Sequence, residues 1–180
     1  VTVNPSNAKD PAPNDKRHVE VAPKGNPLEP VAGPEKQPLA FKTPGFDQWI
    51  KDVAALPAEQ QVEAVSKKLK ELNPEFDGKL SAYPWDLSSP PIFQDGNVAE
   101  LLVFTDKVTD LSPIRALSEL RVLRCIQKQK TGRRLDLSPL NGTRIRTLVL
   151  YLEYVDLFAV KRLDLPLTEL ACFAGEITNL

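Results

Sequence analysis

Few of the side chains that enzymes use for catalysis occur in this sequence in a usable pattern. The single histidine, His18, lies in a proline-rich stretch, so neither a histidine-based triad nor a histidine metal site is expected. The two cysteines, Cys125 and Cys172, lack the paired spacing of a zinc site. There is no glycine-rich phosphate-binding loop, and no pattern places two carboxylates together. We therefore predict a protein that is not an enzyme and that uses no cofactor and no metal.

The most strongly charged part of the chain is basic and lies between residues 114 and 146. It holds nine lysines and arginines against only two acidic residues, Glu119 and Asp136. A phosphorylated partner, a polyanionic glycan or a lipid headgroup would suit such a cluster, whereas the alternative is a solvated loop. Nucleic acid is not expected, because no aromatic side chains are interleaved for base stacking. The candidate anion-binding residues, all within 127–134, are Lys128, Lys130, Arg133 and Arg134.

A recurring apolar pattern in residues 98–180 must position these side chains. Two apolar residues three positions apart are followed by a third two positions later, as in Leu120, Leu123 and Cys125. Successive units start 22, 25 and 22 positions apart, at Val98, Leu120, Ile145 and Leu167. This period predicts about four short leucine-rich repeats with parallel strands. The strands are expected near 100–104, 122–126, 147–151 and 169–173.

The repeat pattern also predicts the state of the two cysteines. Alternate side chains of a strand point to the same face, and Cys125 and Cys172 both take the inward position, in the second and the fourth unit. Neighbouring strands lie ~4.8 Å apart, which separates the two cysteines by roughly 10 Å. A disulfide tolerates a Cα separation of only ~7 Å. We predict that both thiols are free and buried.

The outward face of the same strands is more apolar than a solvated sheet face should be. Four large apolar residues occupy one position of successive strands and should lie side by side: Phe104, Ile126, Tyr151 and Phe173. A continuous apolar stripe suggests a binding surface. The alternative is that residues 84–95, or a neighbouring chain, cover this face. The candidate protein-binding residues are Leu102, Phe104, Val122, Arg124, Ile126, Val149, Tyr151 and Phe173.

The tetrapeptide Asp-Leu-Ser-Pro follows the first two predicted strands, at 110–113 and 136–139. Ser112 is expected to cap a helical turn, and Pro113 suits the first helical position, where its missing N–H needs no partner. The third unit lacks the Ser-Pro pair and has Leu157, Val160 and Leu163 at helical spacing instead. Each unit is therefore predicted to return through a short helical or 3₁₀ segment.

The chain before the repeats divides into two parts. Residues 1–42 are rich in proline and poor in apolar residues, which predicts a disordered linker. A docking motif at 27–30 for a proline-recognition domain is the alternative there. In residues 43–97, helical apolar spacing predicts two helices, over 46–56 and 57–72, that cap the first repeat. A short strand at 79–83 and an irregular excursion at 84–97 should follow.

Bulk properties argue against several classes of protein. A net charge of −1 gives no support for binding nucleic acid or membranes by overall electrostatics. No apolar run is long enough to span a bilayer, and residue 1 onward lacks the apolar core of a signal peptide. The chain has no methionine and its repeats stop uncapped at Leu180, so we expect an excerpt of a longer protein. Its localisation is left open, and a membrane is expected only through an upstream segment.

Three segments carry a family resemblance: FDQWIKDVAALPAEQQVEAV at 46–65, KLKELNPEFDGK at 68–79 and VTDLSPIRAL at 108–117. They resemble a domain attached to bacterial serine/threonine protein kinases. In such proteins a kinase domain is often followed by a membrane segment, a proline-rich spacer, a helix pair and short leucine-rich repeats. The resemblance covers about 44–180, with an apparent insertion at 84–95. No kinase residues carry over, because the glycine-rich loop and the His-Arg-Asp and Asp-Phe-Gly motifs do not occur.

Together these patterns predict an α/β fold: a helix pair capping a short leucine-rich-repeat solenoid, with a proline-rich tail at 1–42. The expected function is a non-catalytic recognition or scaffold module that binds a protein or peptide on its strand face. The resemblance implies the sensing end of a bacterial kinase. A structural spacer without a ligand, and anion binding by residues 127–134, are the alternatives. Whether a small molecule also binds is left open.

Overall fold

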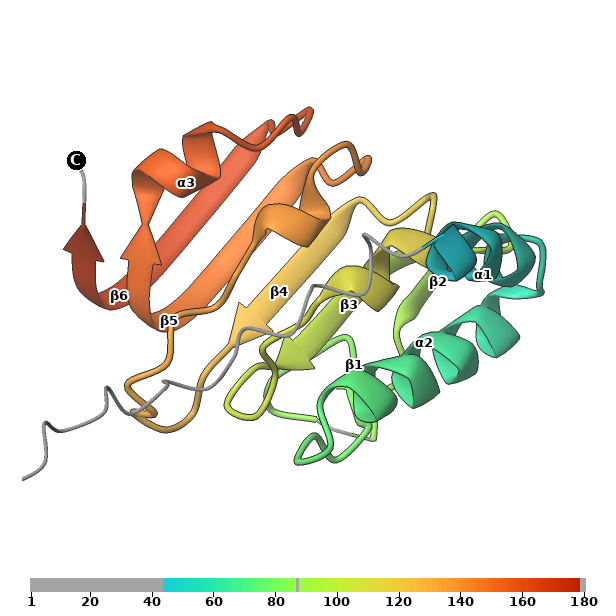
Figure 1. Cartoon of the computed structure of the whole chain (residues 1–180), viewed down its shortest axis with the longest axis horizontal. Helices are drawn as coiled ribbons and strands as arrows, with labels where there is room; N and C mark the ends of the chain where they lie inside the picture. Colours follow the sequence, from blue (N-terminus) through green and yellow to red (C-terminus); the bar gives the residue numbers. More distant parts are fainter. Residues whose placement is uncertain (1–43, 87, 179–180) are drawn as a thin grey trace, which may run out of the picture. The chain divides into compact units, whose positions relative to one another are not determined.

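The computed structural model of the chain describes residues 44–86 and 88–178 (Figure 1). The predicted linker at 1–42, with His18, lies outside the described residues, as does Leu180. The described part has a mixed α/β fold whose six-stranded sheet consists mainly of parallel strands.

Four strands form the parallel part of the sheet: β3 (Asn97–Phe104), β4 (Val122–Ile126), β5 (Thr147–Asp156) and β6 (Glu169–Thr178). Their order in the sheet follows their order in the chain. Residues at equivalent places in the apolar pattern are direct neighbours, which confirms the predicted register. The ladder of inward leucines is Leu101, Leu123, Leu148 and Leu170.

The inward side chains of these strands make the core. In β4, Leu123 and Cys125 are fully buried, whereas the residues between and beside them are half-buried. This alternation of period two is what a strand with one core-facing side requires. Side chains of the return segments, such as Ile114 and Leu140, belong to the same buried cluster. The core therefore lies between the sheet and the segments that connect its strands.

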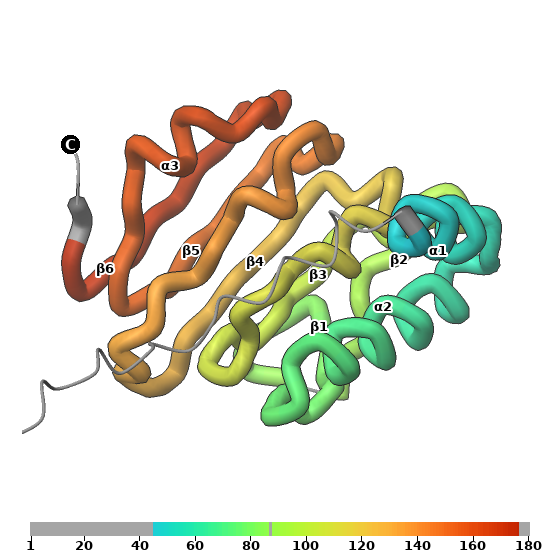
Figure 2. The backbone as a smooth tube through the Cα atoms, viewed as in Figure 1, coloured from blue at the N-terminus to red at the C-terminus, as the bar shows by residue number. Residues whose placement is uncertain are grey.

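Three short segments return the chain over one face of the sheet: η2 (Ser112–Ala116), η3 (Ser138–Leu140) and α3 (Leu157–Lys161) (Figure 2). The prediction that Ser112 caps the first of them is wrong. The carboxylate of Asp110 instead accepts hydrogen bonds from the backbone N–H and the hydroxyl of Ser112. Asp136 accepts from the backbone N–H of Ser138 in the same way, at 2.8 Å. The aspartate of each box, two residues before the turn, satisfies its first N–H.

The third unit uses the same device without the Ser-Pro pair. Asp156 accepts hydrogen bonds from the backbone N–H groups of Phe158 (3.0 Å) and Ala159 (3.1 Å). Val160 on the inner side of α3 is buried. The predicted helical spacing is therefore confirmed, and the aspartate explains why loss of Ser-Pro does not abolish the return.

The excursion predicted at 84–97 is more regular than expected. β2 (Ile92–Gln94) pairs antiparallel with β3, through a two-residue turn at Asp95 and Gly96, both with positive φ. Two such residues between strands are the signature of a tight hairpin turn. A second short strand, β1 (Leu80–Ser81), also pairs antiparallel with β3, as predicted near 79–83. The outer edge of β3 is therefore paired with the segment that precedes it.

The two predicted helices are present as α1 (Pro44–Ala54) and α2 (Ala58–Leu72). Figure 1 shows them together at the β3 end of the sheet. Val53, Val65 and Leu69 lie in the same buried cluster as the inward strand leucines. Leu56, predicted on the inner stripe, is exposed because α1 ends two residues earlier. Among the described residues no helix is both long and apolar enough to cross a membrane.

Asn73 joins the helix pair to the sheet. Its side-chain amide donates to the backbone carbonyls of Leu69 (2.8 Å) and Asp110 (3.0 Å). Its side-chain oxygen accepts from the backbone N–H groups of Thr109 (2.8 Å) and Asp110 (3.0 Å). Asn73 is buried, so these groups have little access to water. One side chain thus satisfies both the end of α2 and the loop before η2.

Replacement of Asn73 should be costly. Asn73→Ala strands several buried backbone groups, and we expect the free energy of unfolding to fall by about 2–4 kcal/mol. Asn97→Ala is the control, because the Asn97 amide makes one local bond to the carbonyl of Asp95. Urea unfolding followed by circular dichroism measures both changes. If Asn73→Ala lowers the free energy of unfolding no more than Asn97→Ala does, Asn73 does not hold the helix pair to the sheet.

The leucine ladder gives a second prediction. Leu148 is 0% exposed and Leu170, at the same ladder position in the last described strand, is 42% exposed. Leu148→Ala should lower the free energy of unfolding by about 2–5 kcal/mol through lost burial and a cavity, and Leu170→Ala by less than about 1.5 kcal/mol. Urea denaturation of both variants measures the two losses. Equal losses would contradict the prediction that burial decides how much each leucine of the ladder contributes to stability.

Candidate functional site

The predicted outer stripe is in place on the strands. Phe104, Ile126, Tyr151 and Phe173 are neighbours in the register of β3 to β6. The rings of Tyr151 and Phe173 stack with centroids 4.2 Å apart and an interplanar angle of 10°. Tyr151 is 43% exposed and Phe173 is 52% exposed. An aromatic pair that remains this open is a surface of the kind that partners bury.

The stripe is not open along its whole length. Leu102, predicted to bind a partner, is 0% exposed. It lies opposite Ser81 of β1, and the excursion between β1 and β2 contributes the buried Ala82. Leu102 is therefore not an exposed part of the stripe, and the cover of this face by residues 84–95 stays a prediction. Leu102 is withdrawn from the candidate site.

Charged side chains close the middle of the face. Arg124 of β4 forms an ion pair with Glu100 of β3 at 2.8 Å, and both are partly buried. The ammonium group of Lys128 lies 3.8 Å from the centroid of the Phe104 ring. Cations are attracted to aromatic ring faces in this arrangement. The open part of the predicted site is therefore at β5 and β6, around Tyr151 and Phe173, with Val122, Ile126 and Val149 half-buried.

The four predicted anion-binding residues do not form one cluster. Lys128 and Lys130 border a groove of about 310 Å³ that also includes Tyr151 and Phe173. Arg133 lies 3.7 Å from the carboxylate of Glu75. The guanidinium of Arg134 lies 5.8 Å from the ring centroid of Tyr154.

Acidic side chains hold the backbone of the basic loop in place. Asp106 accepts hydrogen bonds from the N–H groups of Lys128 and Gln129, and Glu153 accepts from that of Gly132. Glu153 and Glu176 also line the groove beside Lys128 and Lys130. The groove next to the aromatic pair therefore carries charges of both signs, which does not favour a purely anionic ligand.

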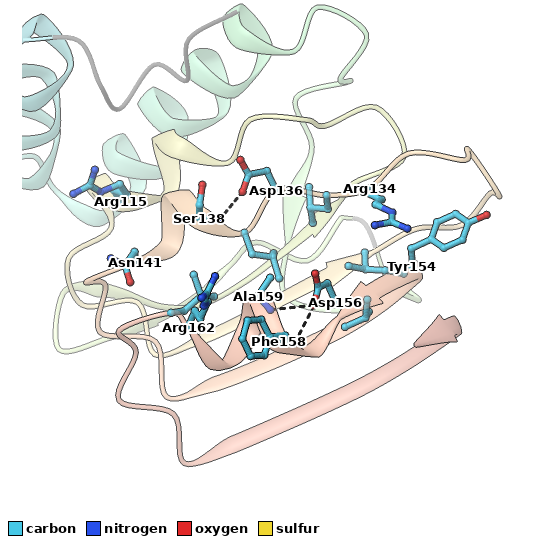
Figure 3. Close-up of a pocket in the computed structure, with 15 residues that line it drawn as sticks. Arg115, Arg134, Asp136, Ser138, Asn141, Tyr154, Asp156, Phe158, Ala159 and Arg162 are labelled. Atoms are coloured by element: carbon cyan, nitrogen blue, oxygen red, sulfur yellow. Dashed lines mark hydrogen bonds between the residues drawn. The ribbon is translucent and has the colours of Figure 1, made fainter. Parts of the chain in front are cut away.

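A larger cavity lies on the other side of β5, where the sequence patterns indicated nothing (Figure 3). It has a volume of about 710 Å³ and lies between η3 and the end of β5 with α3. β4 has 5 residues, whereas β5 has 10. Because α3 follows β5 directly, the chain turns back only after this longer strand. The largely apolar run from Leu148 to Val155, interrupted by Glu153, was the signal that β5 continues.

The wall of this cavity combines apolar, aromatic and basic groups. Leu152 and Val155 are buried beneath it, and Tyr154 and Phe158 line it. Three arginines also line it, Arg115, Arg134 and Arg162. The pKa of Tyr154 is raised, first by the negative charge of Glu153 and then by that of Glu176, so its hydroxyl stays protonated. In residues 44–86 and 88–178 no group of histidine, cysteine or acidic side chains is placed to hold a metal ion.

Both cysteines are free, as predicted. Cys125 is buried, and desolvation raises the pKa of its thiol to about 12. Cys172 is only half-buried, which corrects the prediction that both are buried, because β6 has no described strand beyond it. Burial also raises the pKa of Cys172. Neither thiol therefore has the lowered pKa of a catalytic nucleophile.

The two thiols should react at very different rates. With a thiol-specific disulfide reagent at pH 8, Cys172 should be modified in the folded protein, and Cys125 at least about 100-fold more slowly because labelling requires opening of the core. Cys172→Ser should remove the fast phase and Cys125→Ser should leave it intact. Fast labelling of the Cys172→Ser variant would contradict the burial of Cys125.

Comparison with protein-family models, curated proteins and solved structures finds no match for this chain. Its function must therefore be inferred from the two surfaces described above, the aromatic pair on the outer strand face and the cavity beside α3.

Proposed function

We propose that this chain is a short leucine-rich-repeat array, capped by α1 and α2, that acts as a non-catalytic recognition module. Unit spacings of 22, 25 and 22 residues coincide with the neighbour relations of a parallel ladder, which supports this assignment. In such an array each unit contributes one strand, and the strand face presents side chains in rows.

The observation that carries the proposal is the exposed Tyr151–Phe173 stack. Its rings are stacked in nearly parallel planes with centroids 4.2 Å apart, so they form one continuous apolar surface, called the platform below. Large aromatic residues supply most of the binding energy at protein interfaces when they are buried by a partner. The partner we infer is a protein or peptide that places an apolar side chain on this platform.

The surroundings of the platform resemble the polar rim of an interface. The adjoining groove is lined by Lys128 and Lys130 and also by Glu153 and Glu176. Charges of both signs favour a polypeptide, which can meet them with its own side chains and backbone groups, over a uniformly charged polymer.

The resemblance to the domain of bacterial serine/threonine protein kinases suggests where such a module belongs. We infer that it is the sensing or scaffolding end of a membrane-associated kinase. A spacer without a ligand, and anion binding by residues 127–134, are the alternatives. The dispersal of Lys128, Arg133 and Arg134 among different neighbours favours the peptide over the anion. The complete reading frame decides the parent: absence of a kinase domain would remove that part of the proposal.

Peptide binding is tested by selecting displayed peptides on the immobilised full chain and measuring their affinity for variants. Tyr151→Ala and Phe173→Ala should each weaken binding by about tenfold or more, because each removes half of the platform. Phe158→Ala is the matched control, since Phe158 is also 52% exposed but lies on α3.

Selected peptides that bind the platform variants as well as the unmodified chain would refute the strand-face site. Failure of repeated selections to yield any saturable binder would instead support the spacer. Binding that falls with Arg133→Gln as much as with Tyr151→Ala would point to the anion alternative.

A further inference from the structure

The cavity between η3 and α3 has the volume and lining of a small-molecule site. Its volume of about 710 Å³ lies within the ~300–1,000 Å³ typical of ligand pockets. Buried Leu152 and Val155 provide an apolar floor, and Tyr154 and Phe158 provide aromatic walls. In Figure 3 the polar side chains come from both sides, Asp136 and Ser138 from the η3 side and Asp156 and Arg162 from the α3 side.

Two of the arginines that line the cavity lie over aromatic rings and do not form ion pairs with carboxylates among the described residues. The guanidinium of Arg162 lies 4.5 Å from the ring centroid of Phe158, and that of Arg134 lies 5.8 Å from the ring centroid of Tyr154. Within the described residues neither Arg134 nor Arg162 has a carboxylate within ion-pairing distance. A guanidinium against a ring keeps its in-plane N–H donors available for an anion.

The acidic residues of the wall leave this positive character in place. Asp136 accepts a hydrogen bond from the backbone N–H of Ser138, and Asp156 accepts hydrogen bonds from two backbone N–H groups at the start of α3. Their charges are thus directed at backbone donors. Three arginines against two aspartates leave the cavity lining with an excess of one positive charge.

We propose that this cavity binds a small amphiphilic anion, with a phosphate or carboxylate group on the guanidinium of Arg162 and an aromatic or aliphatic body on the apolar floor. The anionic group would replace water at the guanidinium N–H donors through charge-assisted hydrogen bonds. The body would cover Leu152 and the ring of Phe158. This site is separate from the strand-face platform, so its occupation does not depend on the function proposed above.

The probe for the test is phenyl phosphate, titrated into the isotopically labelled full chain and followed by backbone amide chemical shifts. The amides of Asn141 and Ala159, which line the cavity, should shift in a saturable manner, whereas those of Val149 and Ala171 should not. Inorganic phosphate should bind more weakly because it has no body, and benzyl alcohol more weakly because it has no charge. Benzoate in place of phenyl phosphate distinguishes a carboxylate preference from a phosphate preference.

Charge-removal variants locate the anion. Arg162→Gln should weaken phenyl phosphate binding by about tenfold, and Arg134→Gln, at the other end of the cavity in Figure 3, should weaken it less. Arg146→Gln is the matched control, because Arg146 is exposed and outside the cavity lining. Arg162→Lys keeps the charge but not the planar fork, and should also bind more weakly. Thermal unfolding of each variant verifies that the fold is retained.

Three results would overturn the proposal. Equal weakening by Arg146→Gln would reduce the effect to bulk charge. If benzyl alcohol binds as tightly as phenyl phosphate, the cavity binds apolar molecules without recognising an anion. Shifts that do not saturate, or that centre on Val149 and Ala171, would place the probe away from the cavity.

Discussion

The inward leucine ladder is the constraint on which the rest of the structure depends. In a parallel sheet a side chain can join a common core only if the chain returns to the same register after every crossover. Leu101, Leu123, Leu148 and Leu170 meet that condition although the units differ in length. The connection from β4 to η3 spans 127–137, whereas that from β3 to η2 spans 105–111. The extra residues are thus taken up in the basic loop, outside the ladder.

The same register dictates what the opposite face presents. Because alternate side chains point to opposite sides, a ladder of leucines inside imposes a second ladder outside. This geometry places Phe104, Ile126, Tyr151 and Phe173 side by side on neighbouring strands. Neighbouring side chains then determine which of these four residues is exposed to a binding partner. The ammonium group of Lys128 lies over Phe104 at the β3 end, and the stack of Tyr151 and Phe173 at β5 and β6 remains open.

Sequence periodicity was sufficient for those features that repeat. The presence of the four parallel strands, their register, the two helices and the unbonded state of Cys125 and Cys172 all follow from spacing alone. The errors concern residues whose role depends on contacts distant in the chain. Leu102 fits the outer pattern but is fully buried, and its neighbour in the antiparallel pairing, Ser81, lies 21 positions earlier in the chain. Asn73 reads as a helix stop, yet its side chain bonds to a loop 36 and 37 residues away.

The elongation of β5 accounts for both candidate sites. A strand of the length of β4 would end at Tyr151, and the chain would return directly over the core. In the longer strand, residues 152–156 pair with β6 and carry the return α3 away from η3, which opens the cavity. The same residues extend the strand face beyond the aromatic pair, where Glu153 and Tyr154 form part of the groove. Tyr154 borders both spaces, so the two surfaces share one structural origin although they lie on different sides of the strand.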